Sequence, residues 1–168
     1  MQAVRIVLFA TAAAIIYGIL HDLVTAHLCV EYFTIAHPPL FATDTPWLLA
    51  LGWGVVATWW VGLLLGAGLA AAARLGSRPP LDLKHLARPV VLLMLASAAI
   101  ALIAGAIGAF AFKAVGTPLL EEWAELIPPD RHLAFAAVAS AHMASYAAAL
   151  IGGLYLIGRT ARLRFRNG

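Results

Sequence analysis

Residues 47–73 read WLLALGWGVVATWWVGLLLGAGLAAAA and contain no charged side chain. A helix crosses a bilayer core of roughly 30 Å with about 20 mostly apolar residues, because each residue adds about 1.5 Å. Three further stretches meet this requirement, at about 4–36, 89–112 and 130–158. We therefore predict an all-α fold, an integral membrane four-helix bundle in which residues 1–168 form a single transmembrane domain.

The composition also indicates a membrane protein. Of the 168 residues, 63% are hydrophobic and 11% are charged, and the mean hydropathy is +0.91. Soluble domains carry about 25% charged residues, so this chain is too apolar for that class. The single cysteine, Cys29, excludes an internal disulfide and a cysteine-rich metal site.

Most of the basic residues fall on one side of the four spans, and only Lys113 and Arg131 fall on the other. This positive-inside pattern predicts that both termini are cytoplasmic, in a bacterial inner (plasma) membrane. The net charge of +3 then reflects topology and contact with the lipid bilayer, and no nucleic-acid partner is predicted. The residues on the basic side are Arg5, Arg74, Arg78, Lys84, Arg88, Arg159, Arg162, Arg164 and Arg166.

The ends of the spans carry their own signals. We expect the first helix to run from Val4 to residue 36, where Pro38 stops it, and to project beyond the outer face or bend near it. Residues 118–127, PLLEEWAELI, have the periodicity of a short amphipathic surface helix before the last span. Small residues that let membrane helices approach closely include Gly62 and Gly66.

Ionisable side chains inside a bilayer are functional candidates, because each costs several kcal/mol unless it is paired, hydrated or metal-bound. Counting about 1.5 Å per residue, His21, Asp22 and His142 all lie roughly 22 to 24 Å above the inner boundary. We predict that they form one cluster toward the outer side of the membrane. The supporting residues are Tyr17, Thr25 and Tyr146.

Histidine and carboxylate ligands from different helices suit a divalent transition metal. The candidate metal ligands are His21, Asp22 and His142, with Glu31 or His27 assisting. A haem alternative uses His21 and His142 as axial ligands. The usual His-Glu-x-x-His and Glu-x-x-His signatures are absent. Two other interpretations stay open: a structural clasp between helices, and a proton relay or substrate pathway.

A second, outer cluster is predicted from His27, Glu31 and His132. His27 and Glu31 are one helical turn apart, which fits either an exposed helical pair or the acid and base of an enzyme acting on a lipid or isoprenoid substrate. His37 is expected to be a helix C-terminal histidine favoured by the helix dipole. A non-enzymatic alternative is a small carrier or an accessory subunit, which implies a homo-oligomer or a larger membrane complex.

Residues 17–39, YGILHDLVTAHLCVEYFTIAHPP, resemble the signature of a family of small bacterial four-helix membrane proteins. The resemblance lies in a His-Asp-x-x-Thr start at His21 and a Glu-Tyr-Phe centre at Glu31. No activity is established for that family, so the resemblance adds weight to these residues without assigning a role. The fragment His27-Leu-Cys-Val-Glu31 is also similar to the His-x-x-x-Glu element of sterol isomerase and sigma-2 receptor membrane proteins.

Overall fold

The computed structural model describes residues 1–116, 119 and 121–166. Within these residues the chain is helical and contains no strand. Four segments are long and apolar enough to cross a membrane: Gln2–Leu28, Pro46–Arg74, Leu83–Val115 and Pro129–Arg166. The all-α prediction is confirmed for the described residues, and the four apolar segments indicate a multi-pass membrane protein.

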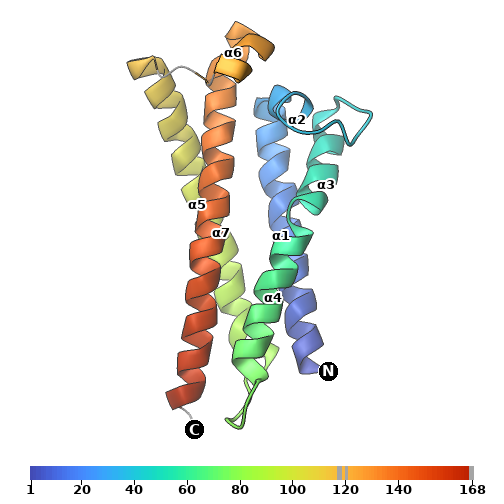
Figure 1. The fold of residues 1–168 in the computed structure, drawn as a ribbon, viewed down its shortest axis with the longest axis vertical. Coiled ribbons are helices and arrows are strands. Elements are labelled where there is room, and N and C mark those ends of the chain that lie inside the picture. The colour runs from blue at the N-terminus through green and yellow to red at the C-terminus, as the bar shows by residue number, and fades with distance from the viewer. Residues whose placement is uncertain (117–118, 120, 167–168) are drawn as a thin grey trace.

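The chain makes four passes, and both termini lie at the same end of the molecule (Figure 1). The first pass is α1 (Gln2–Leu28), which the short α2 (Glu31–Thr34) follows. The second pass is divided into α3 (Pro46–Val56) and α4 (Trp59–Arg74). The third and fourth passes are α5 (Leu83–Val115) and α7 (His132–Arg166), with α6 (Glu121–Leu126) and the 3-10 helix η1 (Pro129–Arg131) between them.

The first pass breaks where the sequence predicted one continuous helix to residue 36. The backbone of Cys29 is extended, with φ −151° and ψ 92°, and α2 starts at Glu31. Cys29 and Phe33 are 0% and 2% exposed and belong to two different apolar clusters. In a continuous helix these two side chains, four residues apart, would lie on the same face and could not reach two separate clusters. Tertiary packing therefore ends the helix at this point.

Other boundaries differ from the prediction by smaller amounts. The second pass is interrupted between Val56 and Trp59, where the Thr58 hydroxyl donates to the Gly54 carbonyl. The third helix begins before Pro89, and the fourth continues through the arginine-rich tail to Arg166. The predicted surface helix is present as α6, whereas Pro118 and Leu120 of that segment lie outside the described residues.

The bundle consists of two closely packed pairs, α1 against α3 and α4, and α5 against α7. Glycines make the first pair close: a Cβ atom placed on Gly62 would lie 2.7 Å from the Thr11 Cα, and one on Gly66 would lie 2.8 Å from the Val7 Cα. The close packing predicted for these two glycines is confirmed. Contacts between the two pairs are sparser than contacts within each pair. Polar side chains that link one pair to the other therefore matter for the stability of the bundle.

Arg164, one of the basic residues predicted to be cytoplasmic, is 5% exposed and links α7 to the loop after α4. Its guanidinium donates to the carbonyls of Ala72 at 3.2 Å, Leu75 at 2.6 Å, Arg78 at 2.6 Å and Pro79 at 3.1 Å. The last carbonyls of a helix have no partner within that helix. Arg164 therefore caps the end of α4 from a neighbouring helix.

We expect Arg164→Ala to lower the free energy of unfolding in detergent by about 2 kcal/mol, because hydrogen bonds from a charged donor contribute about 1.5–3 kcal/mol. The matched control is Arg162→Ala, which removes the same charge from an exposed position on α7. It should change stability by less than about 0.5 kcal/mol. Denaturant titration of both variants measures the difference, and equal losses would contradict the capping role.

Candidate functional site

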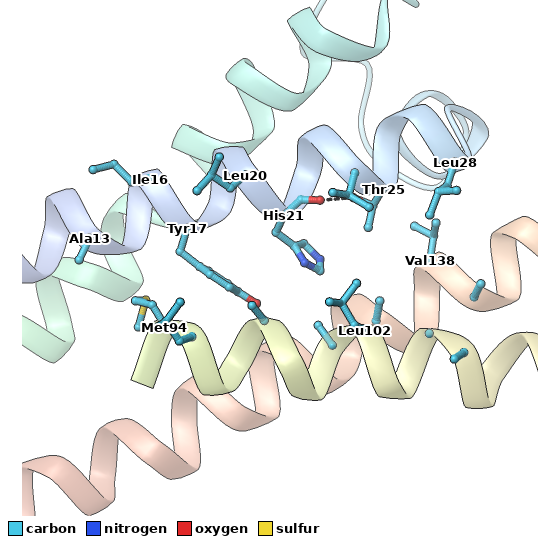
Figure 2. A pocket seen from close by; sticks show the side chains of 18 of the residues that line it. Ala13, Ile16, Tyr17, Leu20, His21, Thr25, Leu28, Met94, Leu102 and Val138 are labelled. Carbon is cyan, nitrogen blue, oxygen red and sulfur yellow. Dashed lines mark hydrogen bonds between the residues drawn. The ribbon is translucent and has the colours of Figure 1, made fainter. Parts of the chain in front are cut away.

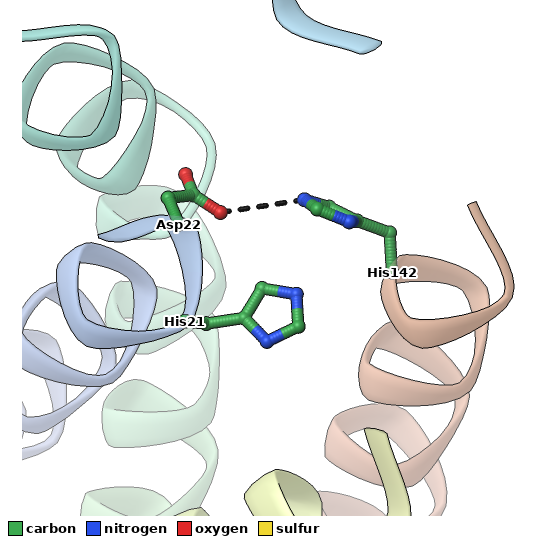
Figure 3. Close-up of side chains that lie close together, drawn as sticks. All are labelled: His21, Asp22 and His142. Atoms are coloured by element: carbon green, nitrogen blue, oxygen red, sulfur yellow. Dashed lines mark ion pairs between the residues drawn. The ribbon is translucent and has the colours of Figure 1, made fainter. Parts of the chain in front are cut away.

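The predicted His/Asp cluster exists in the structure. His21 and Asp22 project from α1 toward His142 on α7 (Figure 3), and one ligand atom from each lies within 4.8 Å of the other two. Asp22 and His142 are 5% and 4% exposed. Among the residues that the structure describes, no other group brings three potential metal ligands together in this way.

Asp22 and His142 form a direct contact, with 3.3 Å between Oδ1 and Nε2. The other imidazole nitrogen, Nδ1 of His142, lies 3.0 Å from the Val138 carbonyl oxygen. A carbonyl only accepts, so Nδ1 carries a proton and donates it. The Nε2–Oδ1 contact then requires one further proton, on either atom, or a bound cation.

His21 lies beside this pair and keeps one nitrogen free. Its ring meets the His142 ring edge-on, with centroids 4.5 Å apart, and stacks on Tyr17 at 5.8 Å. Its Nε2 is buried and has no hydrogen-bond partner within 1–116, 119 and 121–166. Thr25 supports the backbone only, because its hydroxyl donates to the His21 carbonyl at 3.1 Å.

Among the described residues, further polar links between the α1–α2 segment and the η1–α7 segment lie on either side of the cluster. Below it, the hydroxyls of Tyr17 and Ser145 lie 2.6 Å apart. The predicted supporting residue Tyr146 is 43% exposed. Its neighbour Ser145, and not Tyr146, makes this hydrogen bond to Tyr17. Above the cluster, Arg131 donates to Glu31 at 3.0 Å and to the Leu28 carbonyl at 2.9 Å.

The structure does not bring the predicted outer cluster together. His27 is exposed, and its Nδ1 lies 2.6 Å from the carbonyl of Leu23 on its own helix. His132 Nε2 lies 2.8 Å from the Ile127 carbonyl. The break after α1 separates Glu31 from the helical face that carries His27, and neither residue reaches the His21 cluster.

The environment of Glu31 is that of an ion pair. Burial alone raises the pKa of its carboxyl, but a backbone N–H, the Cys29 thiol and Arg131 outweigh burial and hold that pKa below its ordinary value. Burial also raises the pKa of the Cys29 thiol to about 11. Glu31 is thus a charged partner of Arg131, and it is not arranged as a general base for His27.

Three residues after the helix break cover the cluster, and the sequence analysis did not assign them to it. The Tyr32 ring lies 4.4 Å from the His142 ring, and the Phe33 ring lies 5.7 Å from it. His37 Nδ1 lies 2.8 Å from the Tyr32 carbonyl, and its ring meets Trp53 at 4.6 Å. Burial lowers the pKa of His37, and the nearby His142 adds to this, while the Tyr32 carbonyl and Asp22 oppose it.

A cavity of about 820 Å³ adjoins the cluster between α1, α5 and α7 (Figure 2). Its wall is apolar apart from Tyr17, His21 and Thr25. None of the described residues that line it is charged. His21 therefore stands between the buried Asp22–His142 pair and a space that suits apolar molecules.

The geometry does not support the haem alternative. The rings of His21 and His142 contact each other directly, with centroids 4.5 Å apart. Axial ligation would require a porphyrin between them, each imidazole facing the iron from an opposite side. The two helices would have to separate to admit it.

The role of the cluster has to be argued from its geometry. The resemblance of residues 17–39 to a bacterial membrane protein family stays a prediction. Comparison of the chain with protein-family models, curated proteins and solved structures finds no match.

Proposed function

We propose that this membrane protein binds a divalent transition metal ion between α1 and α7, with His21, Asp22 and His142 as ligands. The observation that supports this is the gathering of three ligand atoms within 4.8 Å in a buried setting. Metal–ligand bonds of about 2.0–2.2 Å let two donors lie up to about 4 Å apart, so small side-chain rotations close the site. Two imidazoles and a carboxylate suit zinc, iron, manganese or cobalt.

The surroundings of the cluster favour a metal as well. The Val138 carbonyl fixes the His142 ring so that Nε2 faces Asp22, as an outer partner does for a metal-bound histidine. The free Nε2 of His21 supplies a second imidazole donor. Three protein ligands leave a coordination position for a further ligand. The apolar cavity beside His21 offers that ligand a route from the bilayer.

Metal analysis of the purified protein tests the proposal. After loading with Co²⁺ or Zn²⁺ and gel filtration, we expect about one ion per chain in the wild type and loss of that ion in Asp22→Asn and His142→Gln. His27→Gln is the matched control, because His27 is an exposed histidine on the same helix. Absence of retained Mn²⁺, Fe²⁺, Co²⁺ or Zn²⁺ in the wild type would refute metal binding.

A second candidate role, the structural clasp, has its own supporting observation. One proton shared between Asp22 and His142 satisfies their 3.3 Å contact without any ion. The contact joins the two helix pairs, whose mutual packing is otherwise sparse. In this case the protein remains folded and metal-free, and the two residues still stabilise each other.

We also propose that the end carrying both termini is cytoplasmic, in a bacterial inner membrane. The positive-inside distribution of lysine and arginine supports this orientation. A C-terminal alkaline phosphatase fusion should be inactive, and a C-terminal green fluorescent protein fusion should be bright. The reverse pair of results would invert the topology.

A further inference from the structure

A second groove, of about 460 Å³, lies between α5 and α7 near the end that carries the termini. Two arginines belong to its lining, Arg88 on α5 and Arg159 on α7. The remaining lining includes Leu92, Leu93 and Gly152. The groove therefore combines two cations with an apolar floor, and it is separate from the His21 cluster.

The two arginines are exposed and uncommitted. Neither side chain makes a hydrogen bond or an ion pair with the described part of the chain, whereas Arg74 and Arg78 at the same end do. Arg74 pairs with Asp82 at 3.0 Å, and Arg78 donates to the Phe165 carbonyl at 3.0 Å. Two free guanidiniums on neighbouring helices are a suitable pair of donors for one phosphate group.

The position of the groove indicates which kind of anion it binds. Arg88 directly precedes the apolar residues of α5, and Arg159 directly follows those of α7, so both lie where the spans meet the headgroup layer. Leu92, Leu93 and Gly152 lie about one to two turns further into the hydrocarbon. Tyr155, which also lines the groove, is 64% exposed and suits the interface.

We propose that this groove binds an anionic phospholipid, with its phosphate between Arg88 and Arg159 and an acyl chain along Leu92, Leu93 and Gly152. The lack of a side chain at Gly152 leaves room for Leu93 to lean across toward α7 and form the floor. Basic pockets between membrane helices bind anionic headgroups in this way. A free phosphate would interact only with the two guanidiniums, because it has no acyl chain to contact the apolar floor. The inference does not rest on metal binding.

The test is native mass spectrometry of the full-length protein, titrated with palmitoyl-oleoyl phosphatidylglycerol and with phosphatidylcholine of the same chains. We expect the wild type to prefer phosphatidylglycerol. Arg88→Gln or Arg159→Gln should weaken that binding about fivefold, and the double variant about twenty- to thirtyfold. Circular dichroism checks that each variant is folded, which the exposure of both arginines leads us to expect.

Arg162→Gln is the matched control, because Arg162 is exposed on the same helix but does not line the groove. It should bind phosphatidylglycerol as the wild type does. Equal weakening in Arg162→Gln and Arg159→Gln would overturn the proposal, since it would show attraction to charge in general. Equal binding of the two lipids, or displacement of phosphatidylglycerol by an equimolar amount of soluble glycerol phosphate, would also overturn it.

Discussion

His142→Ala should lower the free energy of unfolding in detergent by about 1–3 kcal/mol, because removing one partner of the buried pair leaves the Asp22 carboxyl without its hydrogen-bond partner. Asp22 is only 5% exposed, so little solvent is available to replace the lost imidazole. The change also removes the ring that His21, Tyr32 and Phe33 contact. Unfolding in sodium dodecyl sulphate, followed by circular dichroism, measures the loss.

The double variant His142→Ala with Asp22→Ala distinguishes the interaction between the two side chains from the effect of removing side-chain volume. Contacting residues are non-additive, so the double variant should cost less than the sum of the two single changes by about 1–2 kcal/mol. Measurement in the presence of a chelator keeps the coupling of the two side chains apart from metal binding. His27→Ala, at an exposed histidine, should change stability by less than about 0.5 kcal/mol. Simple additivity of the two single changes would rule out a direct interaction.

The sequence was sufficient to place His21, Asp22 and His142 together because the rise of a helix is nearly constant. Residues counted from the same membrane boundary therefore reach the same depth on antiparallel helices. The sequence does not determine how far each helix is rotated about its own axis. Adjacent residues point about 100° apart, and the choice of Tyr146 over Ser145 as the partner on α7 depended on that angle.

The features that the sequence did not reveal all depend on tertiary contacts. No glycine or proline marks the break at Cys29, which follows from the separate burial of Cys29 and Phe33. The break is what brings Tyr32 over His142 and turns Glu31 toward Arg131. Arg164 resembles its neighbours in an arginine-rich tail, and only the fold of the loop after α4 gives it four carbonyls to bind.

Gly54→Ala should destabilise the protein by about 2–3 kcal/mol, because overpacking a close interface forces the backbone to shift. A Cβ atom at this position would lie 2.6 Å from both the backbone nitrogen and the Cα of Ile19 on α1. These are main-chain atoms and cannot rotate away, so α1 and α3 would have to separate. Gly18 faces the same contact from α1, since its own Cβ would lie 2.6 Å from the Gly54 carbonyl oxygen.

Gly158→Ala is the matched control for this prediction. Gly158 lies within α7, and a Cβ atom there would meet nothing within 4 Å. Alanine is a better helix former than glycine by up to about 1 kcal/mol, so this variant should be neutral or slightly more stable. Thermal unfolding of both variants in the same detergent gives the comparison. If Gly54→Ala matched Gly158→Ala, then α1 and α3 would not be packed at backbone contact, and the division of the bundle into two close pairs would be wrong.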